Sequence, residues 1–116
     1  MQFDLSGYSL YIRPGATDMR KGSPSLSIII QRQMRLDPFG KSAFFFCGSG
    51  RRTLKAVLWD GNGWLEVIKR LECSETFKWP STREESMMIT PEQLKGLLDG
   101  NDVWRRFPVF RPELAV

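Results

Sequence analysis

The segment between residues 54 and 72 restricts the fold more than any other part of the sequence. As a strand, LKAVLWD (54–60) has one apolar face, and its other face is mixed; a similar division returns in WLEVIKRLE (64–72). The first strand has Leu54, Ala56 and Leu58 on one face and Lys55, Val57 and Trp59 on the other. A period of two indicates β-strands. The intervening DGNG (60–63) favours a tight turn, because glycine and asparagine accept the positive φ angles that such turns require. This segment therefore predicts two antiparallel strands joined as a hairpin.

Other short runs predict the remaining strands. YSLYIR (8–13) alternates and should end at Pro14, whereas AFFFC (43–47) is a short apolar run typical of a buried strand. TFKW (76–79) is a candidate for a further strand, which Pro80 would close. We therefore expect a sheet of about four to five strands.

Two segments carry the signals of helices. PSLSIIIQRQMRL (24–36) spaces its apolar residues at about the helical period, and Ser23 before it is a suitable N-cap. TPEQLKGLLDG (90–100) has stronger signals, because Thr90 and Gln93 have the spacing of a capping box. Together with the strands, these helices predict an α+β fold with a mainly antiparallel sheet of about four to five strands and two helices.

The length of the chain indicates one domain. Its 116 residues suit a single domain over residues 1–116, and no linker rich in Pro, Gly or Ser divides them. The tail at 106–116 has no clear period, and we expect it either to pack on the sheet or to order against a partner. No apolar run approaches the roughly 20 residues of a membrane span, so a cytoplasmic protein is expected.

Histidine is absent from the sequence, which removes much of the usual catalytic chemistry. Without imidazole there can be no Ser-His-Asp triad and no Cys-His pair. Cys47 and Cys73 lie 26 residues apart with no CxxC spacing, so a zinc site is not predicted. Both lie in strand-like runs, which favours buried free thiols over one disulfide. We expect no cofactor and no metal.

Positive charge is concentrated in the first part of the chain. Residues 1–71 contain 11 Lys/Arg and 5 Asp/Glu, a balance of +6, whereas residues 72–116 contain 6 and 8, a balance of −2. A basic region suits a polyanionic partner such as nucleic acid. Basic surface is also common on proteins that bind no nucleic acid, so charge alone leaves the partner open.

Three motifs hold the candidate contact cations. They are GATDMRKG (15–22), GSGRRTLK (48–55) and the end of the second hairpin strand. These cations could contact DNA phosphates or an acidic partner, or they could simply be solvated at turns. In the first motif, a phosphate beside the following helix N-terminus is a third possibility. The candidate contact residues are Arg20, Lys21, Arg51, Arg52, Lys55, Lys69 and Arg70.

A catalytic alternative uses the few carboxylates of the same region. Asp18, Asp60 and Glu66 could form the set that metal-dependent phosphoryl transfer requires. Asp60 is better explained as a turn residue, because it precedes Gly-Asn-Gly. Asp18 is better explained by hydrogen bonds to amides of its own loop. A nuclease is therefore the weakest of the hypotheses that we consider.

The hairpin turn lies between two tryptophans, Trp59 and Trp64. An exposed tryptophan pair could stack on nucleic-acid bases. Packing of the two rings against each other across the strands is the commoner arrangement, and we favour it.

Taken in order, the motifs resemble the small accessory protein encoded by the second open reading frame of bacterial insertion sequences of the sixty-six type, a TnpB-like transposition protein. The resemblance covers residues 8–105. It is carried by GATDMRKG, AFFFC, LKAVLWDGNGW, KRLE, FKWP and ITPEQLKGLLDG. The residues that match the recurring pattern are Asp18, Arg20, Lys21, Gly22, Lys55, Trp59, Asp60, Gly61, Gly63, Lys69, Arg70, Leu71, Trp79 and Pro80. The chain departs from it at 47–53, where the basic run is diluted, and at Glu75.

The resemblance implies a non-enzymatic accessory role in transposition, beside a separate transposase that carries the catalytic carboxylates. It supplies no catalytic residues. We expect contact with DNA, with the transposase and other products of the same insertion sequence, or with both. The alternative is a pure protein–protein interaction module without DNA binding, which the aromatic strands and tail favour. The sequence leaves the oligomeric state open.

Overall fold

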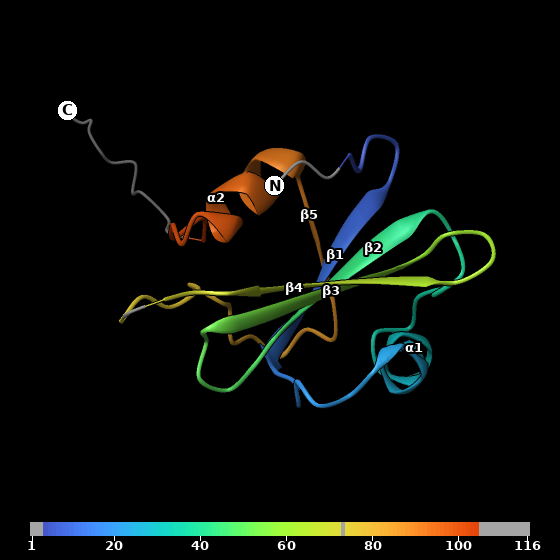
Figure 1. Cartoon of the computed structure of the whole chain (residues 1–116), viewed down its shortest axis with the longest axis horizontal. Helices are drawn as coiled ribbons and strands as arrows, with labels where there is room; N and C mark the ends of the chain where they lie inside the picture. The colour runs from blue at the N-terminus through green and yellow to red at the C-terminus, as the bar shows by residue number, and fades with distance from the viewer. Residues whose placement is uncertain (1–3, 73, 105–116) are drawn as a thin grey trace.

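One twisted mixed sheet organises the described chain, as the computed structural model shows for residues 4–72 and 74–104 (Figure 1). Its strands are β1 (Ser9–Ala16), β2 (Ser42–Cys47), β3 (Thr53–Trp59), β4 (Trp64–Arg70) and β5 (Met87–Ile89). They lie in the order β4-β3-β2-β1-β5, with β1 and β2 parallel and the other three pairings antiparallel. With the helices α1 (Ser23–Arg32) and α2 (Pro91–Leu98), this architecture confirms the predicted α+β class.

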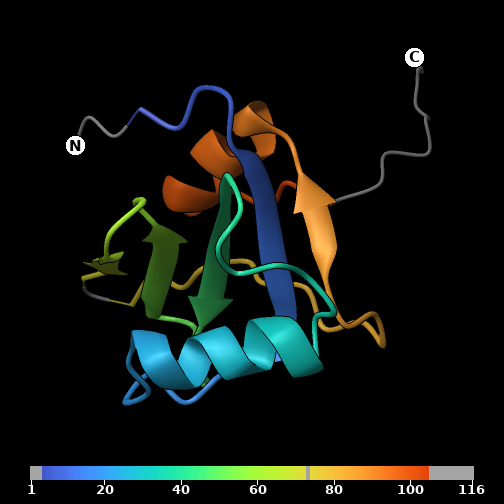
Figure 2. The same ribbon diagram turned by 90° about the vertical axis from the view of Figure 1, so that its right-hand side faces the viewer.

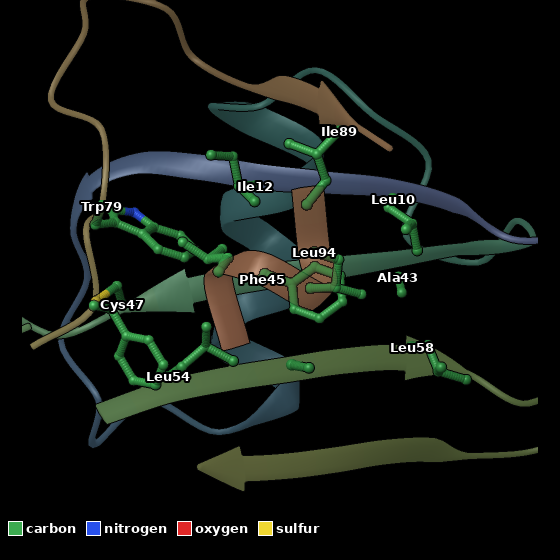
Figure 3. Packing of buried hydrophobic residues seen from close by; sticks show 13 residues of the cluster. Leu10, Ile12, Ala43, Phe45, Cys47, Leu54, Leu58, Trp79, Ile89 and Leu94 are labelled. Atoms are coloured by element: carbon green, nitrogen blue, oxygen red, sulfur yellow. The ribbon is translucent and has the colours of Figure 1, made fainter. Parts of the chain in front are cut away.

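Both faces of the sheet are covered (Figure 2). On one face, α1 packs its buried Leu26 and Ile30 against Phe44 and Phe46 of β2. On the other face, Leu94 and Leu97 of α2 join a larger apolar cluster. Figure 3 shows that cluster, in which Phe45, Leu54, Ile89 and Trp79 converge over the sheet. Consecutive residues of β2 and β3 therefore point into two different cores, which explains the unbroken apolar run AFFFC.

The first strand runs farther than predicted. β1 continues through Pro14 and Gly15 to Ala16, with an irregularity in its register between Ile12 and Ala16. Gly15 has a φ of 82°, a conformation that glycine adopts without strain. Its amide donates to the carbonyl of Pro80 at 2.9 Å. Pro14 is tolerated because the irregular backbone requires no ladder hydrogen bond from it.

The first helix differs from its prediction at both ends. Its N-cap is Gly22, and Ser23 is the first helical residue rather than the cap. It ends at Arg32 instead of residue 36, and Arg35 has a φ of 61°. That left-handed conformation cannot continue a helix. The second helix has the predicted capping box, in which the side chains of Thr90 and Gln93 each accept a backbone amide of the other residue.

Residues 76–79 do not form the predicted strand. They cross the face of the sheet that α2 covers, and Phe77 and Trp79 are buried there. The fifth strand is instead β5, which pairs with β1. The period-two pattern of TFKW arises because Phe77 and Trp79 both point into the core from an extended segment without ladder partners.

Candidate nucleic-acid interface

Two motif loops meet at one end of the sheet. Because β1 and β2 are parallel, the loops that follow them, residues 17–22 and 48–52, begin at the same end of the sheet. The amide of Thr17 donates to the carbonyl of Cys47 at 2.8 Å, which joins the two loops. Between them lies an open groove of about 490 Å³, which we call the motif groove. Its lining residues are Ala16, Thr17, Asp18, Met19, Arg20, Gly48, Ser49, Gly50, Arg52 and Thr53.

Asp18 shapes the first loop. Its carboxylate accepts the amide of Arg20 at 2.9 Å and the guanidinium of the same residue at 2.8 Å. The Arg20 hydrogen bonds hold the pKa of Asp18 well below its usual range. The guanidinium nevertheless remains open to solvent, with 90% of the side chain exposed. The predicted role of Asp18 in binding a loop amide is confirmed.

Lys55, a buried residue of β3, binds the backbone of the same loop. The predicted contact residue is only 5% exposed, so it is not part of the surface. Its ammonium group donates to the carbonyls of Met19 at 3.0 Å and Lys21 at 2.7 Å. Its Nζ also lies 3.9 Å from a carboxylate oxygen of Glu66. Lys55 thus fixes the backbone that presents Arg20 and Lys21, and the prediction of direct contact by Lys55 is corrected.

The carboxylate of Glu66 binds the first residue of α1. It accepts a hydrogen bond from the amide of Ser23 at 3.0 Å and another from the Ser23 hydroxyl. The position where we considered a bound phosphate is therefore taken by the protein's own carboxylate. The Ser23 hydroxyl is the main cause of a lowered pKa for Glu66, with smaller contributions from the Ser23 amide and Lys55.

Replacing Glu66 with glutamine should make the free energy of unfolding less dependent on pH in acid. Since the folded state lowers the pKa of Glu66, its carboxylate stabilises the fold above the unfolded value of about 4.3. That contribution is lost as the pH falls through the folded pKa. Urea titrations from pH 7 to pH 3 should show the stability difference between wild type and Glu66→Gln narrowing below about pH 4.3. Ser23→Ala should remove most of this dependence, and a difference that stays constant to pH 3 would contradict the assignment.

The second loop is held to the segment that crosses the sheet. Arg51 has a φ of 59°, and its guanidinium donates to the carbonyl of Trp79 at 3.0 Å. The amide of Phe77 donates to the carbonyl of Arg51 at 2.6 Å. Just before the loop, Cys47 is a buried free thiol, and burial raises its pKa to about 11. The burial predicted for Cys47 is confirmed, whereas Cys73 lies outside the described residues.

β4 brings the last two candidate cations to the same end. Arg70 pairs with Thr53, and Lys69 pairs with Leu54, at the start of β3. Their side chains point to opposite faces, as predicted, and Lys69 donates to the carbonyl of Leu98 in α2. Five of the seven candidate cations are therefore exposed here, and we call them the basic end. They are Arg20, Lys21, Arg51, Arg52 and Arg70.

The three carboxylates of the nuclease hypothesis are not gathered. Asp60 lies in the turn between β3 and β4, at the opposite end of these strands from Arg70, and its amide donates to Gly63 at 2.7 Å. Asp18 and Glu66 are bound to Arg20 and Ser23, respectively. Within residues 4–72 and 74–104, no three His, Cys, Asp or Glu side chains are placed to hold a metal ion.

The two tryptophans pack against each other beside that turn. The rings of Trp59 and Trp64 are 5.2 Å apart at 71°, which confirms cross-strand packing. Phe39 contacts both rings, at 5.3 Å and 5.6 Å. Sequence reasoning missed the contact of Phe39 with the two rings and the bond of Ser23 to Glu66, because both partners are distant in sequence. The only local signal was the position of Phe39 directly after Asp37-Pro38, a dipeptide typical of turns.

The fold and the site define a small α+β protein whose motif loops present cations around a groove. Over residues 8–107 the chain matches the family model described as IS66 Orf2 like protein, and it belongs to that family. Membership indicates an accessory protein of insertion sequences. No helix among the described residues is both long enough and apolar enough to span a membrane.

Two relatives come from Sinorhizobium fredii (strain NBRC 101917 / NGR234). The uncharacterized protein y4hO is 40% identical over 96 residues, which cover 83% of this chain and 82% of the relative. The uncharacterized protein y4jC is 29% identical over 108 residues, which cover 91% and 92%. No solved structure matches the chain.

Proposed function

We propose that this protein is a non-enzymatic, cytoplasmic accessory protein of transposition that contacts DNA through the basic end. The proposal is supported above all by one observation. Three segments far apart in sequence place their exposed cations at the same end of the sheet, around a groove of about 490 Å³. A cluster of cations on one side of a small domain suits the phosphates of a nucleic-acid backbone.

The exposed cations differ in how readily they can bind phosphate. Arg20 already pairs with Asp18, but an exposed ion pair contributes little stability, so a phosphate can compete for the guanidinium. Arg51 keeps one nitrogen on the Trp79 carbonyl. Lys21 and Arg70 are the most suitable positions for testing contact. Each is exposed, and Arg70 makes one long hydrogen bond, of 3.5 Å, to the hydroxyl of Thr53 on the neighbouring strand.

The double variant Lys21→Glu/Arg70→Glu should bind DNA more weakly and with a smaller salt dependence. Each lost phosphate contact reduces the slope of log affinity against log salt by about 0.9, so the slope should fall by about 2. Fluorescence anisotropy with labelled duplex, single-stranded and element-end DNA measures this slope. Lys95→Glu is the control for reversing one charge elsewhere, because Lys95 is exposed on α2 beside Leu5 and Tyr8, away from the basic end.

The control should bind like the wild type. Absence of binding to all three DNA probes at low salt would remove the DNA part of the proposal. A loss per reversed charge in the double variant no larger than the loss in Lys95→Glu would show that only overall charge matters. The same titration with the transposase present tests the second expected partner. If the transposase binds through the basic end, its addition should raise the DNA affinity of the wild type and leave that of the double variant unchanged.

A further inference from the structure

The sheet has one long edge that no described strand covers. β4 has seven residues and pairs only with β3, whereas the opposite edge, β5, has three. A long edge strand presents unpaired backbone groups that invite another strand. Figure 2 shows β4 and β5 at the two edges of the sheet, with α1 beneath the strands between them.

The hydrogen bonds at the ends of the β3–β4 hairpin show which backbone groups are unpaired. The amide of Asp60 donates to Gly63, and the amide of Leu71 donates to Arg52. In an antiparallel ladder, hydrogen-bonded pairs recur every second residue. The odd-numbered residues of β4 therefore bond to β3. The N–H and C=O groups of the four even-numbered residues face away from the sheet, and these residues are Trp64, Glu66, Ile68 and Arg70.

The side chains of the even-numbered residues 66, 68 and 70 of β4 combine one apolar group with two opposite charges. Ile68 is 54% exposed, which is high for a large apolar residue in a strand. Glu66 precedes it by two residues, and Arg70 follows it by two. All three lie on the same face of the sheet, because side chains alternate along a strand.

We propose that β4 pairs antiparallel with β4 of a second copy of this chain, with Ile68 opposite Ile68 on the twofold axis. This register places Glu66 of each copy opposite Arg70 of the other. The Ser23 hydrogen bonds go to Oε2 of Glu66, so Oε1 can pair with the guanidinium, and two ion pairs flank an apolar contact. The outward N–H and C=O groups of Ile68 then form hydrogen bonds with those of Ile68 in the other copy. The result is one continuous ten-stranded sheet built from the two five-stranded sheets.

Other registers of the same pairing are disfavoured by charge. A shift of the dyad to Glu66 places two carboxylates opposite each other, and a shift to Lys69 places two ammonium groups opposite each other. A dyad at Val67 leaves Glu66 opposite Ile68 without a cation. A twofold pairing is also closed, because each copy uses its long edge once, which protects that edge from further addition.

The association is tested first by mass. Wild-type protein at about 100 µM, far above the micromolar Kd of a weak dimer, should sediment as a dimer. Ile68→Lys should sediment as a monomer with an unchanged fold, because it places like charges opposite each other at an exposed position. Met88→Lys is the matched control, since Met88 is 64% exposed on the other edge strand, and it should remain dimeric. A monomeric wild type, or a dimeric Ile68→Lys, would overturn the proposal.

The register is tested by cross-linking. In a Cys73→Ser background, Ile68→Cys should form an intermolecular disulfide under mild oxidation, because hydrogen-bonded antiparallel pairs have Cα atoms about 5.5 Å apart. Leu65→Cys, exposed on the same strand, should not, because Leu65 lies opposite Leu71 of the other copy. Buried Cys47 should not interfere. Equal cross-linking at both positions would contradict this register.

Discussion

Replacing Lys55 with methionine should lower the free energy of unfolding by about 3 kcal/mol. Methionine fills a similar volume but donates no hydrogen bond. The carbonyls of Met19 and Lys21 would lose their shared donor, and Glu66 would lose its nearest cation. Because these groups lie around an almost fully buried side chain, water cannot replace the ammonium group without opening the loop.

Urea unfolding followed by circular dichroism measures this loss. Lys21→Met is the matched control, because it removes the same charge from an exposed side chain, and its stability should change by less than about 0.5 kcal/mol. The Lys55 variant should also bind DNA less well, because the loop that presents Arg20 and Lys21 would lose its support. A variant as stable as the control would show that Lys55 does not hold the loop.

Replacing Trp79 with alanine should lower the free energy of unfolding by about 3–5 kcal/mol, which is a large part of the total for a small domain. The indole is buried in the cluster of Figure 3. Its Nε1 donates to the carbonyl of Arg13 at 2.8 Å. The variant therefore loses apolar contacts and leaves a carbonyl of β1 without its donor.

Two further substitutions separate these contributions. Trp79→Phe keeps most of the apolar contact and loses the hydrogen bond, so it should cost about 1–3 kcal/mol. Lys78→Ala changes the exposed neighbour and should be nearly neutral. Thermal unfolding of all three gives the order directly. A loss in Trp79→Ala no larger than in Lys78→Ala would show that the segment at 76–79 does not anchor to the sheet.

Local signals predicted the elements whose stability depends on neighbours in sequence. The β3–β4 hairpin follows from its turn residues, and α2 follows from its capping box at Thr90 and Gln93. The parallel pairing of β1 with β2 and the position of β5 could not be predicted in this way. Both depend on pairings between distant segments, such as Leu10 with Ile89.

The same limit explains what was missed at the candidate site. The cations of the two loops were identified from their glycine-rich motifs, but Lys55 was placed on the surface. Alternation along β3 divides its residues between two faces of the sheet. It does not show that helix α1 covers the face that carries Lys55. The signal that could have corrected this was the set of apolar and aromatic residues on that face, Val57 and Trp59.

The position of β1 inside the sheet affects how the chain folds during synthesis. Residues 42–70 can form the β2–β3–β4 meander as soon as they leave the ribosome. β1 is made first, yet its second neighbour, β5, emerges last among the strands. A product that stops before residue 87 therefore leaves one side of β1 unpaired and lacks α2 over the larger core. We expect such a truncated product to aggregate rather than persist as a smaller domain.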